Sequence, residues 1–215
     1  MKLAAGMRMK YGEFVLKRNL KHLKRNVKSC NIDDAKSIGI LFNATNSASF
    51  ETVKNLVKEL SGKRRKIMVL GFIEGKHLID HYLYRKGFEF FTRSHLNWYE
   101  KPKSEAVSEF IKEEFDILIN LNLEESYPIN YILSLSKASF KVGRLTQNHQ
   151  YLDFMIDIEN EIVAMEELQL ELQQDVKNAK THRTNYDSIA DVKTSLELQM
   201  GFLINQLLHY ISKLK

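Results

Sequence analysis

The sequence predicts an α/β fold with three layers, in which helices cover both faces of a mostly parallel β-sheet. Short apolar segments such as 37–43 and 116–121 are typical of strands that are buried on both faces. Helical patterns of about 10–15 residues separate these segments, as in right-handed βαβ units. The 215 residues include only 2 prolines and 9 glycines, which argues against long disordered linkers.

The predicted elements follow in chain order. A helix over 11–28 places Leu16, Leu20, Leu23 and Val27 along one face. Strands are predicted at 37–43, 66–72, 88–92, 116–121, 140–143 and 152–158. Further helices are predicted at 50–60 after the N-cap Ser49, at 76–86 ending at Gly87, at 104–115, and at 128–137 beginning with Pro128.

The last third of the chain differs in composition. Residues 159–180 form an acidic, glutamine-rich helical segment, and 181–191 read as a polar loop. A final helix over 192–214 carries a wide apolar stripe, which we expect to dock on the α/β core rather than to stay free for a partner. The predicted organisation is a basic tail and helix at 1–30, a Rossmann-like α/β domain at 31–158, and a C-terminal helical segment at 159–215 that packs on the core.

Charge is divided unevenly along the chain. Residues 1–103 contain 22 Lys and Arg against 9 Asp and Glu, whereas residues 104–215 contain 10 against 18. The first 28 residues carry 9 basic side chains, opposed only by Glu13. Such a concentration of positive charge attracts polyanions, and added salt weakens the attraction.

This basic segment is the predicted functional site. Its Lys and Arg side chains neutralise phosphates, while Tyr11, Phe14 and nearby amides stack on or hydrogen-bond to nucleotides. The predicted RNA contacts are Arg8, Lys10, Lys17, Arg18, Lys21, Lys24, Arg25 and Lys28, extended by Lys63, Arg64, Arg65 and Lys66. RNA is favoured over DNA because no helix-turn-helix or zinc module is present. An anionic membrane surface is the third choice, and a solvated face that balances the acidic half remains the alternative.

Signals for catalysis are weak. The loop at 43–49 leads into a helix and is able to receive an anion, but it has no glycine and favours a simple helix cap. His77, Asp80 and His81 share a helix face without an identifiable third metal ligand. The carboxylates Asp116, Glu124, Glu125, Asp153 and Asp157 have no partner that spacing identifies. We therefore expect no catalytic residues, no metal and no cofactor.

The single cysteine and the hydropathy of the chain indicate the cellular compartment of the protein. Cys30 has no internal disulfide partner, which fits a reducing compartment, and we expect a buried, unreactive thiol. The N-terminus lacks the apolar segment of a secretory signal, and no stretch approaches the ~20 apolar residues of a membrane span. The sequence predicts a cytoplasmic protein and leaves its oligomeric state open.

Four segments carry a family resemblance: SIGILFNATN at 37–46, FDILINLNLEESYPINYILSLSKASFKVGR at 115–144, YLDFMIDIE at 151–159 and QLLHYISKLK at 206–215. Over most of residues 10–215 the chain resembles an uncharacterised family of Flavobacteria and related Bacteroidota. The resemblance implies a Rossmann-like domain in a bacterial cytoplasm, and 159–191 would be a lineage-specific insertion. The 116–144 region is also faintly similar to the N-terminal half of heptosyltransferase-type glycosyltransferases. The second half of those enzymes, which binds the nucleotide sugar, does not follow Ile158.

These observations together predict a non-catalytic RNA-binding protein. As a small basic protein of one lineage, it would be an accessory ribosomal protein that contacts rRNA and neighbouring ribosomal proteins. The rival hypothesis is a small Rossmann-like enzyme or ligand-binding domain for a nucleotide or sugar nucleotide at the 43–49 loop. A third hypothesis is a protein–protein adaptor that acts through the C-terminal apolar stripe.

Overall fold

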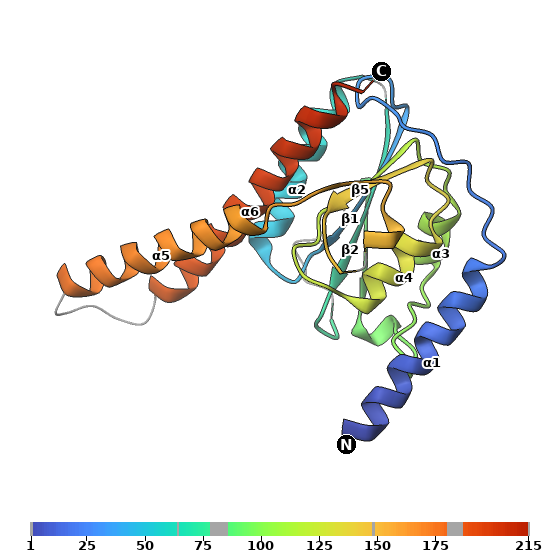
Figure 1. Cartoon of the computed structure of the whole chain (residues 1–215), viewed down its shortest axis with the longest axis horizontal. Helices are drawn as coiled ribbons and strands as arrows, with labels where there is room; N and C mark the ends of the chain where they lie inside the picture. The colour runs from blue at the N-terminus through green and yellow to red at the C-terminus, as the bar shows by residue number, and fades with distance from the viewer. Residues whose placement is uncertain (1, 64, 78–85, 148, 180–186, 215) are drawn as a thin grey trace.

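The computed structural model describes residues 2–63, 65–77, 86–147, 149–179 and 187–214 (Figure 1). One sheet contains the six strands β1 (Ser37–Asn43), β2 (Lys66–Ile73), β3 (Phe88–Thr92), β4 (Ile117–Asn120), β5 (Phe140–Arg144) and β6 (Phe154–Ile156). Their spatial order is β3-β2-β1-β4-β5-β6, and each of these neighbouring pairs is parallel. The predicted fold class is confirmed. This order is that of a Rossmann-like sheet, with the direction of winding reversed between β1 and β4.

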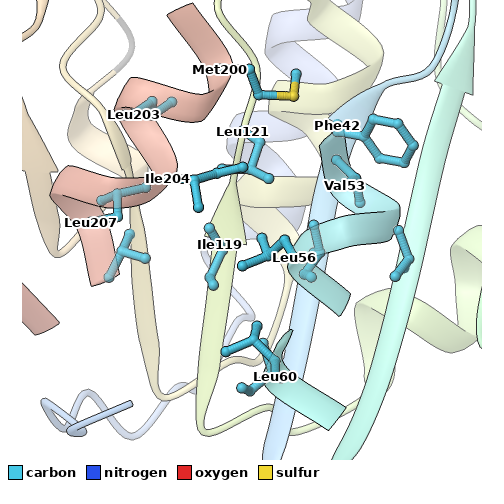
Figure 2. Close-up of a cluster of buried hydrophobic side chains, with 14 of the residues drawn as sticks. Phe42, Val53, Leu56, Leu60, Ile119, Leu121, Met200, Leu203, Ile204 and Leu207 are labelled. Carbon is cyan, nitrogen blue, oxygen red and sulfur yellow. The ribbon is translucent and has the colours of Figure 1, made fainter. Parts of the chain in front are cut away.

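Helices cover both faces of the sheet. On one face α2 (Ser47–Leu60) packs beside α6 (Asp187–Ile211), and on the other lie α3 (Glu105–Lys112) and α4 (Tyr127–Leu135). Alternate residues of β1 serve the two faces, since Ile40 joins the α2–α6 cluster and Leu41 joins the α3–α4 cluster. Figure 2 shows side chains of α6 and α2 meeting over the strands. Because both faces are covered, the central strands are mostly apolar.

The first helix differs from its predicted range. α1 spans Lys2–Leu20 rather than 11–28, and the chain is extended over residues 23–30. The reason is tertiary: the N–H of Lys28 donates to the Ser139 carbonyl at 3.1 Å, and the Arg25 side chain reaches the same edge of the sheet. These contacts with the entrance of β5 outweigh the helical pattern of 21–28.

Other predicted boundaries also shift. The N-cap of α2 is Asn46, whose side chain accepts from the N–H of Ala48 at 2.8 Å, so Ser49 is a buried residue of the first turn and not the cap. β6 is shorter than the predicted 152–158 strand, and α6 begins at Asp187, so that 187–191 is helical rather than loop. The acidic segment is helical as α5 (Glu159–Ala179). Most of the predicted helix at 76–86 lies outside the described residues.

Candidate nucleic-acid interface

A close helix contact positions α1 on the body of the protein. A Cβ atom at Gly12 would lie 2.6 Å from the Tyr127 hydroxyl and 3.2 Å from the Tyr99 carbonyl, so a larger residue here would force one of these neighbours to move. One turn later Leu16 is buried, and the Asn19 amide donates to the Tyr131 hydroxyl at 3.2 Å. Because Tyr127 follows β4, the first half of α1 lies near the carboxyl edge of the sheet.

The predicted phosphate contacts on α1 are accessible. Arg8, Lys10, Lys17 and Arg18 are all exposed, and within the described chain none of them forms a salt bridge. The extended segment after α1 runs up the α4 side of the domain to the amino edge of the sheet (Figure 1). Further exposed cations follow along it at Lys21, Lys24 and Lys28. The basic segment is therefore a continuous surface track and not a core element.

Arg25 is an exception among the predicted contacts. Its Nε donates to the Ala138 carbonyl at 2.6 Å, and its Nη2 donates to the Ser139 carbonyl and pairs with Asp153. The Asp153 carboxylate also accepts from the N–H of Lys141 at 2.8 Å. Arg25 thus fastens the extended segment to β5, and its guanidinium is already occupied by internal acceptors.

The second basic cluster, 63–66, lies at the amino edge where β2 begins, away from α1. The Arg65 side chain is only 5% exposed and donates to the Asp33 carbonyl, so it is not placed to receive a phosphate. Lys66 is exposed but lies 2.7 Å from a carboxylate oxygen of Glu113. Arg64 and the side chain of Lys63 are outside the described residues. The structure does not join this cluster to the track on α1.

An aromatic cluster beside α1 was missed in the sequence. The Tyr11 and Trp98 rings stack with centroids 5.0 Å apart and planes at 29°, and Tyr99 meets both rings edge-on. A small cavity of about 80 Å³ lies close by, lined by Arg8, Met9, Tyr99, Glu100 and Tyr127. The available signal was a tryptophan in a short loop flanked by basic residues, in the stretch RSHLNWYEKPK at 93–103.

The carboxyl ends of β1 and β4 form the position where Rossmann-like sheets bind ligands. Asn120 and Asn122 are buried here, and the Asn122 amide donates to the Asn120 side chain at 2.5 Å. Two N–H groups of the loop after β1 are used within the protein: that of Thr45 donates to Asn43 at 2.9 Å, and that of Ala48 donates to Asn46. These two groups are not available to a phosphate.

The structure explains the roles of other residues that were considered for catalysis or metal binding. The Asp116 carboxylate accepts from the N–H groups of Lys36 and Ser37 at 2.8 and 2.9 Å, which joins the start of β1 to that of β4. Cys30 is half-buried rather than buried as expected. Its partial burial, reinforced by the charges of Asp116 and Asp34, raises the pKa of the thiol, which disfavours the reactive thiolate. Among the described residues no three His, Cys, Asp or Glu side chains are grouped as metal ligands; Asp80 and His81 lie outside them.

A family model matches residues 8–174, from the second turn of α1 into α5. The chain belongs to DUF6913, a family of unknown function. No curated protein matches this DUF6913 chain. The matched region contains the whole sheet, the track on α1 and the aromatic cluster, whereas α6 lies beyond it. Within the described residues of the DUF6913 chain, no helix has the length and apolar character to span a bilayer.

Proposed function

We propose that this protein binds RNA non-catalytically, with the α/β core as a rigid support and the basic track of α1 and residues 21–28 as the binding surface. The contacts are Arg8, Lys10, Lys17, Arg18, Lys21, Lys24 and Lys28, without Arg25 and Arg65, whose guanidinium groups are held internally. The Lys63–Lys66 cluster is not part of the proposed surface, because Arg65 is held internally and Lys66 pairs with Glu113.

The placement of the track supports the proposal. The alternative is a solvated charged face that balances the acidic C-terminal half, or a face that docks on it. Docking is disfavoured, because α1 lies on one side of the sheet and the acidic α5 projects from the opposite side (Figure 1). Among the described residues no acidic helix lies against α1, and an exposed row of cations is the electrostatic footprint expected of a polyanion-binding surface.

Neutralising the exposed track is expected to weaken RNA binding strongly. Each phosphate contact on a single strand contributes about 0.7 to the slope of log affinity against log salt concentration. Five to seven contacts therefore predict a loss of about 10²- to 10³-fold between 50 and 200 mM salt. The triple variant Lys10→Gln, Lys17→Gln and Arg18→Gln should reduce the slope by about 2, measured by fluorescence anisotropy with a labelled RNA oligonucleotide.

A matched control removes the same charge elsewhere. Lys58, Lys112 and Lys213 are exposed on α2, on α3 and beyond α6, and their triple replacement by glutamine also lowers the net charge by three. The proposal requires that this control keep the wild-type slope within about 0.5. Equal slopes for the two triple variants would show that only net charge matters and would overturn the assignment of the track.

The finer proposal is that the RNA is ribosomal. A small basic protein with an extended surface track fits a position along rRNA, with neighbouring ribosomal proteins as further partners. Sedimentation of tagged protein through a sucrose gradient at low salt should place it with a ribosomal subunit, and the α1 triple variant should move to the top fractions. Wild-type protein found only in the top fractions would reject the ribosomal role.

A second candidate is supported by strand order. The reversal of winding between β1 and β4 is where this fold class binds nucleotides, so a small-molecule site between the loop after Asn43 and Asn122 is the rival proposal. A thermal-shift screen with nucleotides and sugar nucleotides distinguishes the two. Stabilisation by one micromolar ligand would favour the rival, whereas stabilisation by polyanions in general would favour RNA binding.

A further inference from the structure

The exposed face of α1 carries a stripe of large side chains, two of them aromatic, as well as cations. Met7, Tyr11, Phe14 and Arg18 recur at spacings of four, three and four residues and are all exposed. Lys10 and Lys17, seven residues apart, run beside this stripe. The combination of large exposed apolar side chains with adjacent cations is unusual for a solvated surface and indicates a binding surface.

Trp98 extends the stripe beyond the helix. Its ring stacks on Tyr11, yet 58% of Trp98 and 46% of Tyr11 remain exposed. Lys101 follows three residues after Trp98, with its ammonium 5.7 Å from the centre of the Tyr131 ring, and Lys103 is exposed nearby. The paired rings are therefore about half exposed, on a surface that also carries the cations Lys101 and Lys103.

Hydrogen bonds brace the backbone of the loop that carries Trp98. The Asn97 side-chain oxygen accepts from the N–H groups of Tyr99 and Lys101 at 3.1 and 2.9 Å, and the N–H of Asn97 donates to the Lys101 carbonyl. Glu100 closes the turn with φ of 64°. Preorganised aromatic side chains lose little conformational freedom when a ligand stacks on them.

We propose that the Tyr11–Trp98 pair is a stacking platform for an unpaired base, so that the RNA is single-stranded where it crosses α1. This inference rests on the proposed RNA binding and specifies its substrate class. Bases inside a duplex are hidden by their neighbours, whereas bases of a single strand offer both faces to aromatic rings. The cations Lys10, Lys17 and Arg18 lie within the same surface to hold the connecting phosphates.

The single tryptophan of the chain makes the platform directly observable. Trp98 fluorescence is followed during titration with a 12-nucleotide oligouridine, a 12-base-pair RNA duplex and, separately, inorganic polyphosphate. The expected result is saturable quenching by oligouridine. The duplex and polyphosphate are expected to bind, as measured by competition, without comparable quenching.

A pair of matched variants tests the energetic contribution. Tyr11→Ala should weaken oligouridine binding by about 5- to 150-fold, the effect of losing one base stack, and should leave duplex binding within about twofold. Tyr210, on α6, is exposed to the same extent at 47% but lies outside the basic track, so Tyr210→Ala should leave both affinities within twofold. Circular dichroism melting of both variants verifies that they remain folded.

The outcomes separate the two proposals. Oligouridine binding without quenching, or equal losses for single strand and duplex in Tyr11→Ala, would overturn the platform while the proposed RNA binding stands. Failure of both RNA forms to bind at low salt would overturn the proposed function and the platform together. A blue-shifted, enhanced Trp98 emission with vesicles of anionic phospholipid, in the absence of quenching by oligouridine, would overturn the platform in favour of a membrane surface.

Discussion

Replacing Leu203 by aspartate is expected to destabilise the protein by at least about 4 kcal/mol. Leu203 is fully buried on α6, in the cluster that also contains Val53 and Leu56 of α2 (Figure 2). A carboxylate at this position has no counter-charge to pair with, because the surrounding cluster is apolar. A typical domain is stable by only about 5–15 kcal/mol, so this loss removes a large part of the stability and favours release of α6 from the sheet.

Urea denaturation, monitored by circular dichroism, measures this loss in the free energy of unfolding. A nearby position on the same helix supplies the control. Leu198 belongs to the same helix but is 58% exposed, so Leu198→Asp should change the free energy of unfolding by less than about 1 kcal/mol. Similar losses for both variants would show that any acidic residue disturbs α6. A small loss for Leu203→Asp would show that the stability of the protein does not depend on the packing of α6 against the sheet.

This experiment bears on the extent of the folded unit. The DUF6913 match ends at residue 174, within α5, but the α2 face of the sheet is covered largely by α6. Without α6, buried residues such as Ile119 and Leu121 of the β4 region would lose their cover on that side. A chain cut at the end of the family match would therefore expose a large apolar surface, which favours aggregation.

The fold was predictable because periodic patterns report burial directly. Continuous apolar runs such as 37–43 and 117–120 occur where a strand is covered on both faces, and amphipathic runs such as 47–60 occur where a helix covers one face. Boundaries were predicted less well, because tertiary contacts determine them. Residues 21–28 have helical periodicity, but the hydrogen bond from Lys28 to Ser139 and the pairing of Arg25 with Asp153 hold this segment extended.

The candidate site was only partly predictable for a similar reason. Charge density is a local property of the sequence, so it identified the track on α1. Whether a particular guanidinium is free depends on residues far along the chain: Arg25 contacts Ala138 and Arg65 contacts Asp33. The Tyr11–Trp98 platform joins positions 87 residues apart, and no local pattern links them.

The stability of the protein is expected to rise with pH between about 7 and 10 because of Lys141. This side chain is buried in β5, and its Nζ donates to the carbonyls of Leu133 and Ser134, near the end of α4, at 2.6 and 3.2 Å. The pKa of Lys141 is lowered to about 7, mainly by burial and in part by the charge of Arg25, while the charge of Asp153 opposes the shift. In the unfolded chain the pKa of a lysine is about 10.4.

The sign follows from proton counting. Between these two pKa values the unfolded chain binds the proton that the folded protein has released, so raising the pH favours the folded state. Each pKa unit corresponds to about 1.4 kcal/mol, which predicts a gain of about 3 kcal/mol between pH 7 and 9.5. Urea denaturation at these pH values measures the gain, and Lys141→Met should abolish it.

Comparison with the methionine variant removes the effects of other titrating groups. The Cys30 thiol has a raised pKa in the folded protein, which lowers stability at alkaline pH, but both proteins share this effect. Lys137, exposed just after α4, provides the matched control: Lys137→Met should keep the wild-type dependence on pH. Parallel curves for wild type and Lys141→Met would mean that the two carbonyls near the end of α4, aided by Asp153, retain the ammonium in the folded protein despite its burial.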